Sequence, residues 1–60
     1  MNKYYNTDDI AEMLDVHVRT VRNWINRGEL PAIKVANKYR IDKEDFQQYL
    51  DDRRVQGSQD

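Results

Sequence analysis

Apolar residues recur at helical spacing in the first part of the chain. Ile10, Ala11 and Leu14 share one face of a helix, because they lie one, three and four positions apart. Thr7 precedes them and is predicted to cap the helix, since its hydroxyl oxygen can accept a hydrogen bond from a free backbone N–H. Two aspartates follow in the first turn, where the helix dipole favours negative charge. The pattern predicts a helix over residues 8–14.

A second apolar period follows after a very short connection. Asp15 and Val16 leave no room for a loop and predict a tight turn, since aspartate is among the residues that tolerate positive φ. The next helix is predicted to begin at His17, a weak cap, or at the residue after it. It ends near Gly28, which suits a left-handed cap. Its apolar face comprises Val18, Val21, Trp24 and Ile25. Trp24 is therefore predicted to anchor the core rather than to lie exposed.

Alternation replaces helical spacing between residues 32 and 41, which predicts a β-hairpin. The apolar positions are Ile33, Val35, Tyr39 and Ile41. If all four face the core, the first pairs with the last and the middle two pair with each other. Lys34 and Arg40 then face outward together, and residues 36–38 form a three-residue loop. Asn37 is the loop residue best suited to positive φ.

A final helix is predicted after the hairpin. Asp42 caps it, and its apolar stripe, Phe46, Tyr49 and Leu50, runs to about Arg53. The first tyrosines of the chain, Tyr4 and Tyr5, are expected to pack against the hairpin. The fold class is therefore mainly α with a small β-hairpin, in the order helix, helix, hairpin, helix. Residues 1–54 form one domain, and residues 55–60 form a polar, disordered tail.

Charge is distributed unevenly, although the formal net charge is only −1. Residues 1–16 carry one lysine against four acids, and residues 41–60 carry three bases against six acids. Residues 17–40 carry six bases against one glutamate, a net charge of +5. A positive middle between two negative ends favours a polyanionic partner, although charge clusters also occur on ordinary solvated surfaces.

Composition excludes several classes of protein. Without cysteine the chain has no disulfide and no zinc-finger spacing, and its one histidine cannot build a metal site alone. It has no nucleophile–base pair and no phosphate-binding glycine loop, so we expect neither an enzyme nor a cofactor. No apolar run approaches the roughly 20 residues that span a membrane. No signal peptide opens the chain. We expect a cytoplasmic, nucleoid-associated protein.

The stretch from Tyr4 to Leu50 resembles the excisionase-type, MerR-like winged helix-turn-helix family. The helix-turn-helix pattern expects apolar or small residues at six positions, and all six match: Ile10, Ala11, Leu14, Val16, Val21 and Trp24. The segment "RTVRNWINRGELPAIKV" carries the most characteristic part of the likeness. The sequence departs from the pattern at Asp15 and at the tip formed by residues 36 and 37, where the family often has glycine. His17 also replaces the usual Ser or Thr cap.

The resemblance implies binding of double-stranded DNA. It places the second helix in the major groove and the hairpin, as a wing, on the backbone or the adjacent minor groove. Small members of the family act as excisionases, which bind and bend attachment sites, or as transcription regulators. Others form the N-terminal domain of longer proteins. A homodimer, cooperative tandem copies, and a recombinase or other regulatory protein are the further partners left open.

Nine residues are predicted to contact DNA: Arg19, Thr20, Arg22, Asn23, Arg27, Lys34, Asn37, Lys38 and Arg40. Arg19 and Arg22 suit the O6 and N7 acceptors of guanine, and Asn23 suits adenine. The three wing cations suit phosphates, which position a protein without specifying sequence. Thr20 suits either a phosphate or the packing against the first helix. Arg27 suits either a phosphate or the end of its own helix.

Two other functions stay open. The acidic ends and the sequence pI of 5.7 fit a protein-interaction module that keeps the fold without binding DNA. The chain can also be the N-terminal DNA-binding domain of a longer partition or regulatory protein. A steep dependence of duplex binding on salt would favour DNA, whereas no binding at low salt would favour the interaction module.

Overall fold

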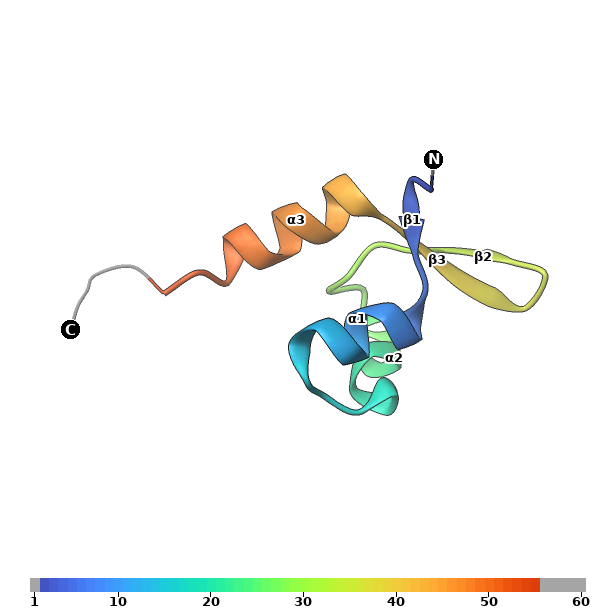
Figure 1. The fold of residues 1–60 in the computed structure, drawn as a ribbon, viewed down its shortest axis with the longest axis horizontal. Helices are drawn as coiled ribbons and strands as arrows, with labels where there is room; N and C mark the ends of the chain where they lie inside the picture. The colour runs from blue at the N-terminus through green and yellow to red at the C-terminus, as the bar shows by residue number, and fades with distance from the viewer. Residues whose placement is uncertain (1, 56–60) are drawn as a thin grey trace.

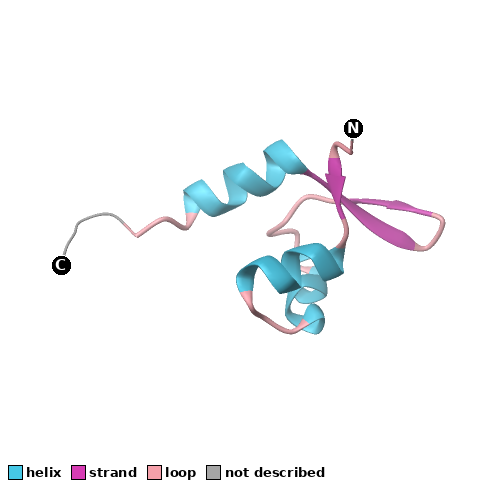
Figure 2. Cartoon of the chain, in the orientation of Figure 1, coloured by secondary structure: helices cyan, strands magenta, loops and turns pink. Residues whose placement is uncertain are grey.

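The computed structural model describes residues 2–55, and it has the predicted mainly helical architecture (Figures 1 and 2). The elements in chain order are β1 (Tyr4–Tyr5), α1 (Thr7–Leu14), α2 (Val18–Asn26), β2 (Ile33–Val35), β3 (Lys38–Asp42) and α3 (Lys43–Asp52). α1 and α2 lie below a small antiparallel sheet, and α3 extends from the end of β3 in the direction away from the wing (Figure 1). The fold is a winged helix-turn-helix, with the β2–β3 hairpin as its wing. The predicted tail lies, apart from Val55, outside the described residues.

The cap of α1 is one residue earlier than the sequence predicted. Asn6 is the N-cap, and Thr7 is already the first residue of the helix. The Asn6 side chain accepts a hydrogen bond from the Asp9 backbone N–H at 2.7 Å, and the Asp9 carboxylate accepts from the Asn6 N–H at 3.1 Å. This reciprocal pair satisfies two backbone donors that a helix start otherwise leaves free. The prediction of Thr7 as cap was therefore wrong.

The turn and both ends of α2 follow the sequence prediction. Asp15 has φ 55°, so a non-glycine residue occupies the left-handed position of the turn. His17 caps α2, because its Nδ1 accepts from the Arg19 N–H at 3.0 Å. Gly28 has φ 79° directly after the helix, a conformation that costs glycine little. The connection between α1 and α2 is accordingly short and fixed by local hydrogen bonds.

The hairpin register differs by one residue from the prediction. Ile33 pairs with Arg40, Lys34 with Tyr39, and Val35 with Lys38. Directly paired residues lie on the same face of an antiparallel sheet, so Tyr39 shares its face with Lys34 rather than with Val35. The prediction that Lys34 and Arg40 face outward together was therefore wrong. Ile33 and Val35 are about half exposed, at 50% and 52%, instead of buried.

The turn explains the shifted register. Ala36 and Asn37 both have positive φ, 51° and 64°, as a two-residue type I′ turn requires. Positive φ at Asn37 was predicted. An alanine in this conformation brings its Cβ close to the following carbonyl, at a cost of roughly 1–2 kcal/mol. The sequence prediction assigned three residues to the loop, because it paired the four apolar residues of the two strands with one another.

Replacing Ala36 with glycine should raise the free energy of unfolding by about 0.5–1 kcal/mol, since the steric cost of positive φ disappears. Ala32→Gly is the matched control, because Ala32 directly precedes β2, at the other end of the strand from Ala36, and is not at positive φ. This control should lower stability by a similar amount. Urea unfolding of both variants measures the difference. A loss of stability in both would show that residue 36 is not left-handed and would favour the three-residue loop.

The core lies between the helices and the inner face of the sheet. Its buried members are Ile10, Ala11, Val21, Leu30, Ile41, Phe46 and Tyr49. Asp42 caps α3 as predicted, with its carboxylate accepting from the Glu44 N–H at 2.7 Å. Trp24 packs on this core but is only half buried, and its ring centroid lies 5.3 Å from that of Tyr49. Trp24 therefore joins α2 to α3 at the margin of the core.

The N-terminal tyrosines form a strand that the sequence did not predict as such. Tyr4 pairs with Asp42 and Tyr5 with Ile41, so β3 is the central strand of the sheet. The Tyr5 ring packs edge-on against Phe46, with centroids 5.5 Å apart. The expected packing of both residues against the hairpin is confirmed. None of the helices within residues 2–55 has the length and apolar character needed to cross a bilayer.

Candidate nucleic-acid interface

The outer face of α2 is polar and exposed. Val21 is fully buried against α1 and the core, which fixes the rotation of the helix about its axis. Arg19, Arg22 and Asn23 consequently lie in solvent. An exposed helix face that carries two guanidinium groups and an amide can donate hydrogen bonds to the acceptors on base edges in a major groove. The DNA contacts that the sequence predicts for these three side chains require this exposure.

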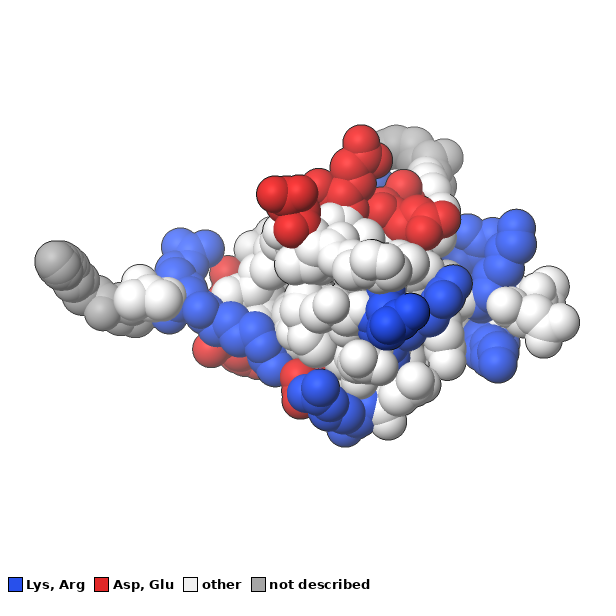
Figure 3. Space-filling model, turned by 90° about the horizontal axis from the view of Figure 1, so that it is seen from below, with Lys and Arg blue, Asp and Glu red and all other residues white. Residues whose placement is uncertain are grey.

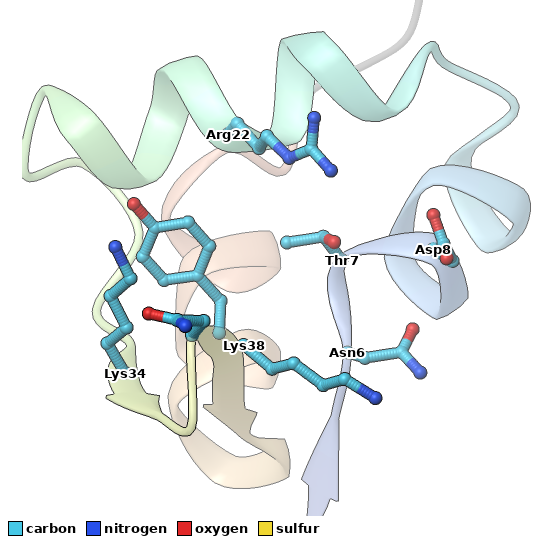
Figure 4. Close-up of a pocket in the computed structure, with 8 residues that line it drawn as sticks. Asn6, Thr7, Asp8, Arg22, Lys34 and Lys38 are labelled. Carbon is cyan, nitrogen blue, oxygen red and sulfur yellow. The ribbon is translucent and has the colours of Figure 1, made fainter.

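A groove of about 400 Å³ separates α2 from the wing. Its lining residues are Asn6, Thr7, Asp8, Arg22, Lys34, Asn37, Lys38 and Tyr39. Figure 4 shows Arg22 extending from α2 above Thr7, and Lys38 extending from the start of β3 toward Asn6. Three cations from two distant segments therefore border one concave surface, with a single carboxylate, Asp8, at the start of α1.

Tyr39 makes one contact with α2 and another within the wing. The Tyr39 hydroxyl donates to the Asn26 side-chain oxygen at 3.3 Å, which connects β3 to the end of the helix. The Lys34 ammonium lies 5.6 Å from the centroid of the Tyr39 ring, within the range of a cation–π interaction. Because Tyr39 contacts both elements, the spacing between the wing cations and α2 depends on this side chain. Sequence reasoning placed Tyr39 in the core and missed its contacts in the groove.

Three predicted contact residues lie away from the groove. Arg27 caps the far end of α2, and its guanidinium pairs with the Glu29 carboxylate at 3.3 Å. Arg40 is on the opposite face of the sheet from Lys34, as the register requires. Thr20 is half buried on α2 and does not line the groove. The structure thus brings together Arg22, Lys34, Asn37 and Lys38, with Arg19 and Asn23 on the adjoining helix face.

Charges of opposite sign occupy different parts of the surface. On the face seen from below, acidic side chains gather along the upper edge, while basic side chains lie around the wing and along the lower left, where a few acidic side chains lie beside them (Figure 3). The sequence accounts for this division, because residues 4–18 contain only acidic charges and residues 30–41 only basic ones, apart from the histidine. The negative charge of the chain therefore does not neutralise the basic face.

A separate cluster joins the ends of α2 and α3. The Arg53 guanidinium lies 3.7 Å from the centroid of the Tyr49 ring and 3.5 Å from the Glu29 carboxylate. Burial raises the pKa of Tyr49, and the nearby positive charge of Arg53 offsets part of that shift. The phenol is thus neutral at pH 7 and has a packing role. Within residues 2–55, no three histidine, aspartate or glutamate side chains gather as a metal site.

Comparison with known proteins agrees with this geometry. A family model described as a helix-turn-helix domain matches residues 4–54. The chain is also 37% identical over 51 residues to the uncharacterized protein YvgK of Bacillus subtilis (strain 168), a match that covers 85% of this chain and 17% of that protein. No solved structure matches the chain. The family model spans nearly all of the described residues, and the protein belongs to the excisionase-like helix-turn-helix family of DNA-binding domains.

Proposed function

We propose that this domain binds double-stranded DNA sequence-specifically, with α2 in the major groove and the wing on the adjacent backbone or minor groove. The observation that carries the proposal is the convergence of Arg22, Lys34 and Lys38 on one groove beside the exposed face of α2. An α-helix fits the major groove, and cations flanking it can reach the phosphates on either side. The family match supports DNA as the partner.

The roles divide by chemistry and by position. Arg19, Arg22 and Asn23 face the base edges, because a planar guanidinium or amide can pair bidentately with guanine or adenine. Lys34 and Lys38 contact phosphates as point charges. Asn37, at the tip of the wing, lines the same groove and can approach the DNA backbone. Arg27 and Arg40 have no part in this arrangement, since they lie outside the groove.

The proposed activity is that of a small architectural factor of the excisionase type or a transcription regulator. The match to YvgK covers only 17% of that protein, so a place within a longer regulatory protein fits the comparison equally well. Both readings use the same DNA surface. Sequencing the duplexes that the purified domain retains from a random pool tests them together, since both require a preferred site. Retention of unrelated sequences only would contradict sequence-specific binding.

Lys38→Ala should weaken the binding of preferred and random duplexes by similar factors. It should also lower the slope of log affinity against log salt by about one unit, the loss expected for one phosphate contact. Lys43→Ala is the matched control, because Lys43 is an exposed lysine on α3 outside the groove. Fluorescence anisotropy at several salt concentrations measures both slopes. A Lys38 variant that loses only specific binding, at an unchanged slope, would mean that the wing reads bases.

A further inference from the structure

Most of the wing is a two-stranded arm, which comprises residues 33–40. β1 pairs with β3 only at Ile41 and Asp42. From Arg40 to the turn, β3 pairs with β2 alone, and all three residues of β2 are exposed. A two-stranded hairpin by itself is at best marginally stable in water. The position of the arm relative to the helices therefore depends on the contacts that its side chains make.

The hydroxyl group of Tyr39 links the arm to α2. It donates a hydrogen bond to the side-chain oxygen of Asn26, at 3.3 Å. Within the described part of the chain, no other side-chain hydrogen bond and no ion pair joins residues 33–40 to a helix. The Tyr39 ring also packs against the margin of the core, but this packing does not require the hydroxyl group. The hydroxyl is thus the polar link between the arm and the helix.

This link joins two groups of side chains that border the same groove. On the wing, Tyr39 pairs directly with Lys34 across the strands and follows Lys38 in the chain. On the helix, Asn26 lies four residues after Arg22, so the two share one face of α2. Both lysines and the arginine line the groove (Figure 4). The hydrogen bond therefore sets the spacing between the two wing cations and the arginine of α2.

We propose that Tyr39 is a positioning residue for DNA recognition, and that its hydrogen bond to Asn26 keeps the wing cations in register with α2. This inference rests on the proposed function, since it concerns how the wing and α2 bind one duplex. Phosphates and base edges lie at fixed spacings in a duplex, so a preferred site requires both contacts at once. Without the hydroxyl, the arm occupies the required position for only part of the time. The apparent affinity falls by that fraction, although every side chain that contacts DNA remains.

Tyr39→Phe removes the hydroxyl and keeps the ring, with its packing and its contact with Lys34. The affinity for the preferred duplex should fall by about two- to tenfold, the range expected for one hydrogen bond. Random duplex should lose less, because it does not require phosphate and base contacts in register. The slope of log affinity against log salt should stay unchanged, since the number of phosphate contacts is the same. Fluorescence anisotropy measures all three quantities.

A double-variant cycle distinguishes this link from a direct contact of either residue with DNA. Asn26→Ala removes the acceptor at the other end of the link, on an exposed residue. Adding Tyr39→Phe to Asn26→Ala should weaken binding no further, because the interaction is already absent. Tyr4→Phe is the matched control, since it removes a hydroxyl outside the groove, and it should keep the wild-type affinity. Wild-type affinity in Tyr39→Phe, or losses that multiply in the double variant, would overturn the proposal.

A measurement without DNA tests the link independently of the proposed function. Residual dipolar couplings of backbone amides report the orientation of the arm, averaged over motions faster than milliseconds. In Tyr39→Phe these couplings should shrink at residues 34–38 and stay unchanged at residues 10–14 of α1, which also verifies the fold. If Tyr39→Phe does not fold, Asn26→Ala replaces it. Failure of the wild-type chain to bind any duplex would refute the proposed function, whereas unchanged couplings at residues 34–38 would refute the link.

Discussion

Replacing Ile41 with alanine should unfold most of the protein at 37 °C. Ile41 is fully buried in the central strand, where it pairs with Tyr5 of β1 and packs against the core. Truncating a buried isoleucine costs about 2–5 kcal/mol, because apolar contacts are lost and a cavity remains. A single core in a domain this small supplies only roughly 3–5 kcal/mol. Thermal unfolding followed by circular dichroism should therefore show little or no cooperative transition.

Ile33→Ala is the matched control for this prediction. It removes the same atoms from the other strand of the hairpin, at a side chain that is 50% exposed. The expected loss is below about 1 kcal/mol, as for most surface substitutions. Equal and large losses in the two variants would show that both residues are buried, as the register predicted from the sequence requires.

The helices could be predicted from the sequence because each is specified locally. The local signals are the spacing of Ile10 and Leu14, the left-handed conformation of Asp15 and the glycine after α2. Each of them determines the conformation of only a few neighbouring residues. The cap of α1 depends on something more distant. Asparagine and threonine are both good caps, and the pairing of Tyr5 with β3 decides that the helix begins directly after Asn6.

The hairpin register could not be predicted from alternation alone. Apolar residues alternate in both strands, so a burial rule pairs all four of them, whereas the actual turn places the two strands one residue out of phase. The type I′ turn requires positive φ at Ala36, which alanine disfavours. The inner side of β2 is instead occupied by Lys34, whose ammonium lies over the Tyr39 ring. The apolar residues of β2 thus stay partly exposed, because the tight turn sets the register of the hairpin.

The candidate site was predictable on α2 and less so on the wing. The rotation of α2 follows from its apolar stripe, so the exposure of Arg19 and Arg22 follows as well. On the wing, a shift of one residue moves a side chain to the other face. Lys34 therefore moves to the face of Tyr39 and borders the groove, whereas Arg40 keeps its predicted outward face and lies away from the groove. The role of Tyr39 as a link to Asn26 could not be predicted, because it depends on the distance between two elements.

Arg19→Ala and Arg22→Ala should keep the fold and lose discrimination between DNA sequences. Both side chains are exposed, so the free energy of unfolding should change by no more than about 0.5 kcal/mol. Losing one bidentate guanine contact should cost about 1–3 kcal/mol on the preferred duplex. Random duplex should lose less, since only the general charge is removed. Anisotropy titrations against preferred and scrambled duplexes measure the ratio of the two affinities.

Arg54→Ala is the control for the loss of one positive charge. Arg54 is exposed after α3 and pairs with Asp51 at 3.2 Å, away from the groove. This variant should keep the full ratio between preferred and scrambled duplex. If Arg19→Ala or Arg22→Ala melts early, that arginine has a structural role. If both α2 variants keep the same ratio of affinities for preferred and scrambled duplex as Arg54→Ala, α2 does not read the bases.

The most direct measurement of the central claim is a titration of the isotope-labelled protein with its preferred duplex, followed by NMR of the backbone amides. The account predicts the largest changes at residues 19–23 of α2 and at residues 34–38 of the wing. Residues 47–52 of α3, on the far side of the core from the groove, should change little. The largest changes on α3 or around Arg40, or no change at low salt, would contradict DNA binding through α2 and the wing groove.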